Sequence, residues 1–151
     1  MRWRCRTGID YVISALNTDV LREIYMAEEC IWRADSVAQA HSRFRRQIAL
    51  CAAAALSNAA ALAAEMLSLG GVPPAGRPGP RVRTYDAASI EECLIQAQSL
   101  LAHYQKRLAM AERLGLSRLR EVFREIVKSK RAHVLHAAVT AAAGARPRQL
   151  S

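Results

Sequence analysis

The sequence has few aromatic side chains, and this scarcity argues against a fold built from β-sheets. Aromatic residues make up only 5% of the 151 residues, although 52% are hydrophobic. The candidate core therefore consists mainly of alanine, leucine, isoleucine and valine, a mixture that favours closely packed helices. A chain of this length can also bury a core of its own. We therefore expect a single all-α domain over residues 1–151.

The sequence also lacks the short cysteine pairings of a zinc ribbon or a redox motif. Its cysteines are Cys5, Cys30, Cys51 and Cys93, and three of them fall within helical patterns. The first residues have no apolar stretch of the kind found in a secretory signal. Reduced thiols in a cytoplasmic protein are therefore expected.

One apolar run nearly reaches the length of a membrane span. It extends from Ala49 to Leu69. Most of it is alanine, and it contains the polar residues Ser57, Asn58 and Glu65, so it is more typical of a packed bundle helix than of a transmembrane helix. We expect a soluble protein without a membrane partner.

Lysine is scarce, yet the chain is strongly basic. Its only lysines are Lys106, Lys128 and Lys130, while the net charge is +9 and the pI is about 10.1. Such a field attracts nucleic acid, anionic lipid or an acidic partner. Arginines on solvated helix faces are the stronger explanation, so charge alone assigns no function.

Apolar residues recur at helical spacing in four segments. We expect helices at about residues 9–37, 42–69, 89–114 and 117–143. Local signals at their ends agree with this division. These signals are Thr7 with Asp10 at the first start, Gly70 and Gly71 at the second end, Ser89 with Glu92 at the third start, and Gly115 with Ser117 between the last two helices.

The connections between these helices predict their topology. Residues 70–87 are rich in glycine and proline and cannot sustain a helix. About 17 residues at roughly 3 Å each reach on the order of 50 Å, whereas a helix of about 28 residues is about 40 Å long. A short, a long and a short connection therefore predict two hairpins joined by a crossover in a four-helix bundle.

Three parts of the chain are typical of one known family, namely residues Val12–Glu23, residues Leu62–Pro73 and the surroundings of His133. Through them nearly the whole chain resembles the bacterioferritins, and the end of its second helix also resembles the related Dps proteins. This resemblance implies a ferritin-like four-helix bundle with a long crossover between helices 2 and 3. In bacterioferritins, two glutamates and two Glu-x-x-His pairs project inward and hold two irons that oxygen oxidises.

The resemblance implies that this centre has been lost. Glu23 fills the first-helix position and His133 fills the final histidine position. The other ligand positions fall at Ala55, Asn58, Lys130 and Ala97, or at Gln96 or Gln98 if the register shifts. Two matches among six cannot hold two irons, so iron belongs to the family rather than to this chain, and no ferroxidase activity is expected. The haem-ligating methionine position falls at about Leu56, so haem is not expected either.

Lys130 lies on the same stripe as Ile126, His133 and Ala137, where an unpaired ammonium would be costly. An ion pair with an inward-facing Glu23 would replace the metal. Alternatively, a slight rotation of the helix would let Lys130 extend into solvent, and the sequence favours neither arrangement over the other. His133 is expected to be a hydrogen-bonded core histidine, and Glu23 alone is compatible with the surface.

A second interpretation uses the thiols. Ferritin topology would bring Cys30, Cys51 and Cys93 together inside the bundle with His136 or His133 at the edge, and such ligands suit copper(I) or zinc. Buried cysteine more often serves as a small apolar filler. A residual single-metal site at Glu23 and His133 is another form of this interpretation.

Three functions follow from these patterns. The leading one is a non-catalytic ferritin-like subunit that forms a homodimer or a larger shell, either alone or with an active ferritin subunit. Its first helix presents apolar Ile24, Tyr25 and Trp32 as a candidate interface. The second is metal binding. The third is Dps-like, sequence-independent nucleic-acid binding through phosphate contacts of Arg2, Arg4, Arg6, Arg43, Arg45 and Arg46.

Overall fold

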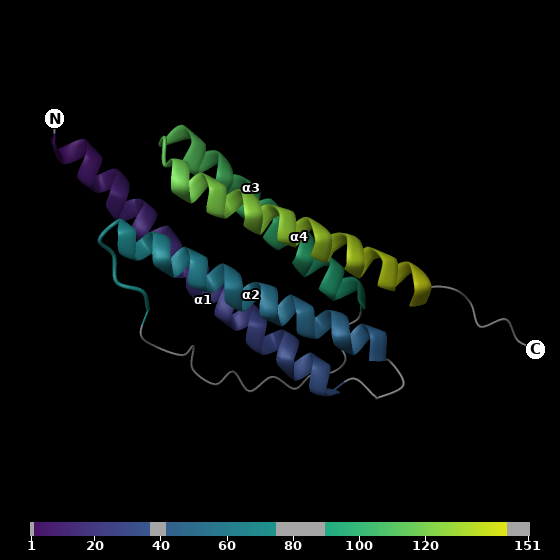
Figure 1. The fold of residues 1–151 in the computed structure, drawn as a ribbon. Coiled ribbons are helices and arrows are strands. Elements are labelled where there is room, and N and C mark those ends of the chain that lie inside the picture. Colours follow the sequence, from purple (N-terminus) through teal and green to yellow (C-terminus); the bar gives the residue numbers. More distant parts are fainter. Residues whose placement is uncertain (1, 37–41, 75–89, 145–151) are drawn as a thin grey trace, which may run out of the picture. The chain divides into compact units, whose positions relative to one another are not determined.

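The computed structural model describes residues 2–36, 42–74 and 90–144. For residues 2–7, 33–36, 42–44, 90–93, 141 and 143–144 it describes the backbone only. The described residues form four α-helices and no strand (Figure 1). These helices are α1 (Arg2–Ser36), α2 (Ser42–Ser68), α3 (Ile90–Arg113) and α4 (Ser117–Gly144). The expected all-α class is confirmed.

The chain divides into two compact units, Met1–Arg81 and Val82–Ser151. In the first unit α1 packs against α2, and in the second α3 packs against α4, each pair as an antiparallel hairpin (Figure 1). The single domain over residues 1–151 stays a prediction. Of the expected crossover at residues 70–87, only residues 70–74 belong to the described chain.

The first helix begins earlier than expected. The sequence predicted a start near Ile9 with Thr7 and Asp10 as its cap, but α1 begins at Arg2. Residues 2–8 contain no proline, and a helix that has already formed extends by one hydrogen bond per residue at little cost. Thr7 and Gly8 are therefore accommodated inside the helix, and the expected cap is wrong.

Two glycines end helices as expected. Gly70 has a φ of 84° and Gly115 has a φ of 66°, a left-handed conformation that favours glycine. In both places the next residue donates a backbone hydrogen bond back to the last turn, from Gly71 N to Met66 O at 2.9 Å and from Leu116 N to Ala111 O at 3.0 Å. Both ends are Schellman motifs.

The expected cap at Ser117 is wrong. The amide of Arg120 donates to the carbonyl of Leu116 at 2.8 Å, so the first helical hydrogen bond closes on the residue before Ser117. Ser117 therefore lies in the first turn of α4.

Small residues set the packing of the first unit. Val12, Leu16, Val20 and Ala27 of α1 are buried, as are residues of α2 that are mostly alanine, namely Ala52, Ala55, Ala59, Leu62 and Met66. A Cβ atom at Gly71 would lie 2.8 Å from Ile13 Cγ2 and 2.9 Å from Met66 Cγ. The chain after α2 is therefore held tightly against α1.

The second unit has larger core residues. Tyr104 and Phe123 are fully buried, with ring centroids 6.2 Å apart. Leu119, Ile126 and Val127 of α4 complete this core with Met110 and Ala111 of α3. Two of the scarce aromatic residues are thus buried in the core between α3 and α4.

Within the described residues, one helical stretch, Arg45–Ser68 of α2, is long and apolar enough to cross a membrane by length and composition alone. Only 28% of its apolar window is buried. Its exposed side carries Ala49, Leu50, Ala53, Leu56, Ala60, Ala64 and Leu67. An uncharged surface that is exposed to solvent therefore extends along most of α2.

Candidate functional site

Glu23 is fully buried on the side of α1 that packs against α2. The side-chain amide of Asn58 donates a hydrogen bond from Nδ2 to Glu23 Oε2 at 3.0 Å. The interpretation of Glu23 as a surface residue is therefore wrong. The resemblance to bacterioferritins places Glu23 and Asn58 at two of the six iron-ligand positions. It did not predict that the two side chains form a hydrogen bond with each other.

Most of the buried residues around Asn58 on α2 are alanines. Ala55, one turn before Asn58, is buried, as are Ala52 and Ala59. A methyl group offers no lone pair to a metal ion or a proton. The polar chemistry of α2 at this level is therefore confined to the Asn58 amide.

Two further acidic residues are buried in the first unit, and sequence reasoning gave neither a role. Asp19 is fully buried one turn before Glu23, and its Oδ1 lies 3.9 Å from Nη1 of Arg22. Glu65 is nearly buried, and the hydroxyl of Ser68 donates to its backbone carbonyl at 2.7 Å. The i, i+4 spacing of Asp19 and Glu23 was the available signal, because it places both on one helix face.

Lys130 is buried in the second unit, with 4% of its surface exposed. Its ammonium lies 5.7 Å from the centroid of the Tyr104 ring, within the range of a cation–π interaction. Tyr104 also meets His103 edge-on, with centroids 5.1 Å apart. The alternative in which Lys130 extends into solvent is wrong.

The other expected site residues of α3 and α4 have mixed environments. Ala97 is buried whereas Gln96 and Gln98 are exposed, so the inward position of α3 is an alanine without a shift of register. His133 and His136 are half-buried. The ion pair of Lys130 with Glu23 joins residues of different units and stays a prediction.

Within the described residues, no three or more histidine, cysteine, aspartate or glutamate side chains form a group able to hold a metal ion. Cys30 and Cys51 lie in one packed cluster of the first unit. The side chain of Cys93 lies outside the description. The site of Cys30, Cys51, Cys93 and His136, and the site of Glu23 and His133, combine residues of both units and stay predictions.

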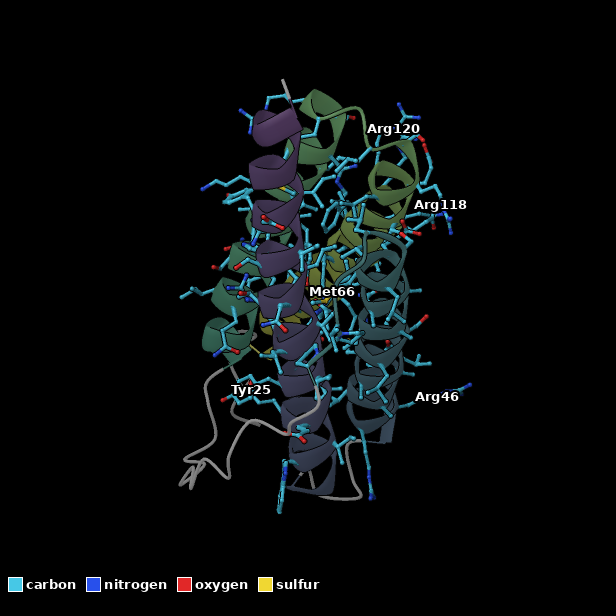
Figure 2. The ribbon with its side chains drawn as sticks, turned by 90° about the vertical axis from the view of Figure 1, so that its left-hand side faces the viewer. Tyr25, Arg46, Met66, Arg118 and Arg120 are labelled. Carbon is cyan, nitrogen blue, oxygen red and sulfur yellow. The ribbon has the colours of Figure 1, made fainter. Side chains whose placement is uncertain are left out.

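The exposed candidate residues lie on the outer side of the first unit. Trp32 has 66% of its surface exposed, whereas Ile24 and Tyr25 are half-buried. Arg45 and Arg46 are exposed, and Arg46 points away from α1 (Figure 2). The side chains of Arg2, Arg4, Arg6 and Arg43 lie outside the description.

Charge pairing is clearest on the exposed side of α4. Nη1 of Arg124 donates to both carboxylate oxygens of Glu121, at 2.7 and 2.8 Å, and Nε of Arg120 donates to Oε1 at 3.2 Å. The hydrogen bond from Arg124 is the largest cause of a lowered pKa at Glu121. This network is solvated and defines no site.

Comparison with known proteins identifies the fold. No family model matches the sequence, and no curated protein matches it. The chain is similar in structure to a bacterioferritin from Desulfovibrio desulfuricans that was solved with its di-iron site in different catalytic states. The TM-score is 0.80 at 18% identity, over 90% of this chain and 81% of that chain.

It is also similar to a ferritin-like di-iron-carboxylate protein from Bacillus anthracis strain Ames. The TM-score is 0.78 at 18% identity, over 89% of this chain and 97% of that chain. The chain therefore has the ferritin-like four-helix fold, as its periodicity and its resemblance predicted.

Proposed function

We propose that this protein, with its ferritin-like fold, is a subunit that has lost the di-iron oxidation centre and acts through assembly rather than catalysis. The hydrogen bond from Asn58 to Glu23 carries this proposal. It supplies a protein donor to a buried carboxyl group that would otherwise face a metal. The proposal thus accounts for a retained Glu23 next to altered ligand positions.

The residues at the other ligand positions do not suit iron. The side chains of Ala55 and Ala97 have no donor atom, and Asn58 has a neutral amide in place of the family's imidazole, with its nitrogen hydrogen-bonded to Glu23. Lys130 is a buried cation where the family carries a carboxylate, and a buried cation disfavours a nearby dication. Haem is not expected, because Leu56 has no ligating atom.

An exposed apolar patch supports assembly. Ile31, Trp32, Leu50 and Leu56 are each at least half exposed, and we call them the α1–α2 patch. Large apolar side chains exposed on neighbouring helices support an interaction surface, because apolar patches on soluble proteins often mark interaction sites. We propose that the patch joins two copies of the chain, or one copy and another ferritin-like subunit, in the cytoplasm and without a membrane.

Iron(II) oxidation tests the loss of the centre. Iron(II) is added to anaerobic protein, oxygen is admitted, and oxygen consumption is recorded beside buffer alone. We expect identical traces. A fourfold variant that restores ligands, with Ala55→Glu, Asn58→His, Ala97→Glu and Lys130→Glu, provides the positive comparison. Stoichiometric oxidation with two irons bound per chain of the unmodified protein would contradict the proposal.

Nucleic-acid binding is a second candidate because Arg45 and Arg46 are exposed at the beginning of α2. Phosphate contacts of this kind weaken steeply with salt. A gel-shift series against salt with an Arg45→Gln, Arg46→Gln double variant tests it. Binding that survives in the variant would exclude these two arginines.

A further inference from the structure

The hydrogen bond between Asn58 and Glu23 fixes the register of the first unit. Because α1 and α2 are antiparallel, moving forward along α1 and backward along α2 by the same number of residues reaches the same level of the hairpin. Seven residues correspond to about 10 Å along a helix and turn a side chain by only about 20°. A pair displaced by seven residues therefore meets across the same seam.

That displacement leads to two cysteines. Cys30 is seven residues after Glu23, and Cys51 is seven residues before Asn58. Both are present as thiols, Cys30 is buried, and Cys51 packs against the cluster that contains Cys30. The register and the packing thus agree in placing the two cysteines at the same level of the α1–α2 hairpin, in one cluster.

A third sulfur atom belongs to the same cluster. Met26 lies four residues before Cys30, on the same face of α1, and packs against the same core of Cys30, Ile48 and Ala52. The remaining members of the cluster are aliphatic. Two thiols and one thioether therefore share an otherwise apolar environment.

We propose that Met26, Cys30 and Cys51 form a binding site for monovalent copper. Thiolate and thioether sulfur are the soft ligands that select Cu(I), whereas structural zinc takes four nitrogen or sulfur ligands. Binding forms bonds from Cu(I) to the two cysteine sulfurs and the methionine sulfur, and both thiol protons pass to solvent. No electron is transferred.

Two of the three proposed ligands are accessible to solvent. Cys51 and Met26 are only partly buried, so an ion can reach Cys30 through them. The donor set lies within the first unit, unlike a site that includes Cys93 and His136. Its three donor residues belong neither to the α1–α2 patch nor to the iron-ligand positions of the family.

Competition for Cu(I) tests the site. A variant with Cys5→Ser and Cys93→Ser retains Cys30 and Cys51 as its only thiols. Under anaerobic conditions it competes with a chromogenic Cu(I) chelator, and ultraviolet charge-transfer absorption reports sulfur ligation. We expect one copper per chain and no retention of zinc(II). Loss of copper in this variant, or equal retention of zinc, would overturn the assignment.

Two further changes in this background assign the ligands. Cys51→Ser should weaken copper binding by more than the roughly 10- to 100-fold that removal of a second-shell partner costs. Met26→Leu keeps the side-chain volume and should weaken it by about tenfold. Far-UV circular dichroism checks that both variants remain helical. Unchanged affinity in Cys51→Ser overturns the site, and unchanged affinity in Met26→Leu removes the thioether from it.

Discussion

At the scale of single residues, the first unit contains a half-buried amide, Asn58, that donates a hydrogen bond to a buried carboxyl group, Glu23. Replacing Asn58 by alanine leaves the buried Glu23 without this donor. A buried polar group that loses its partner costs about 1–3 kcal/mol. We expect Asn58→Ala to lower the free energy of unfolding by about that amount, as measured with urea at neutral pH.

The adjacent residue provides the control. Ser57 is exposed on the same turn of α2, so Ser57→Ala should change stability by no more than about 0.5 kcal/mol. Equal stability of the Asn58→Ala and Ser57→Ala proteins would contradict a structural role for the hydrogen bond.

Lys130 allows a second test at this scale. Its stem is buried and its ammonium lies over the Tyr104 ring, so Lys130→Ala removes both packing and charge and should cost on the order of 3 kcal/mol. Lys130→Met keeps the apolar stem and should cost less. Lys128, which is solvated, is the matched control.

A double-mutant cycle of Lys130→Ala with Glu23→Gln tests the predicted ion pair between Lys130 and Glu23. Additive effects of the two changes on the free energy of unfolding would reject this pair.

Sequence reasoning identified Glu23, Asn58 and Lys130 but not all their environments. Periodicity places a residue on a helix face, and the burial of Glu23 and Lys130 was one of the alternatives that the sequence left open. The bond from Asn58 depends on the axial offset between α1 and α2, and a shift of one residue would turn Asn58 away. That offset comes from packing along both helices, and no single residue determines it.

At the scale of helices, three glycines have different roles. Gly8 lies inside α1 with no atom near its missing Cβ, whereas a Cβ at Gly71 would overlap Ile13 and Met66. We expect Gly8→Ala to raise the free energy of unfolding by about 0.5–1 kcal/mol. Gly71→Ala should lower it by about 1–3 kcal/mol because of overpacking.

Gly115→Ala separates conformation from crowding. Its missing Cβ also meets nothing, but its φ of 66° costs a substituted residue about 1–2 kcal/mol. Urea unfolding of the three variants ranks them. A destabilised Gly8→Ala protein would show that α1 does not extend back to Arg2.

These glycines also show which helix ends could be predicted. Gly70 and Gly115 each adopt a left-handed conformation that favours glycine, so the ends of α2 and α3 were predicted correctly. The start of α1 was not, because Thr7 and Asp10 resemble a cap but nothing before them stops the helix. A capping pattern permits a start, whereas a glycine in the left-handed region enforces an end.

At the scale of the whole molecule, assembly should depend on the α1–α2 patch. Trp32 is its most exposed member, and a two-fold axis would bring the patch against its own copy. We expect the unmodified protein to be at least a dimer by light scattering at micromolar concentration. Trp32→Glu should shift it toward monomer while far-UV helicity survives.

A change outside the patch serves as the control. Leu135 of α4 is exposed to a similar extent, with 67% of its surface accessible, so Leu135→Glu introduces the same charge elsewhere. It should leave the oligomer intact. A monomeric unmodified protein, or equal dissociation by both variants, would contradict the proposed interface.

The fold class was predictable from periodicity and loop lengths. The proposed interface could be identified only from the solvent exposure of individual side chains in the structure.

The hydrogen bond between Asn58 and Glu23 also has an evolutionary consequence. A change at position 58 removes a donor from the buried Glu23 carboxyl group, and a change at position 23 removes the acceptor of the half-buried Asn58 amide, so each residue restricts the substitutions that the other tolerates. The two positions are therefore epistatic. Among proteins that share this hairpin, positions 23 and 58 should covary, either as a carboxyl group with an amide or as two apolar residues.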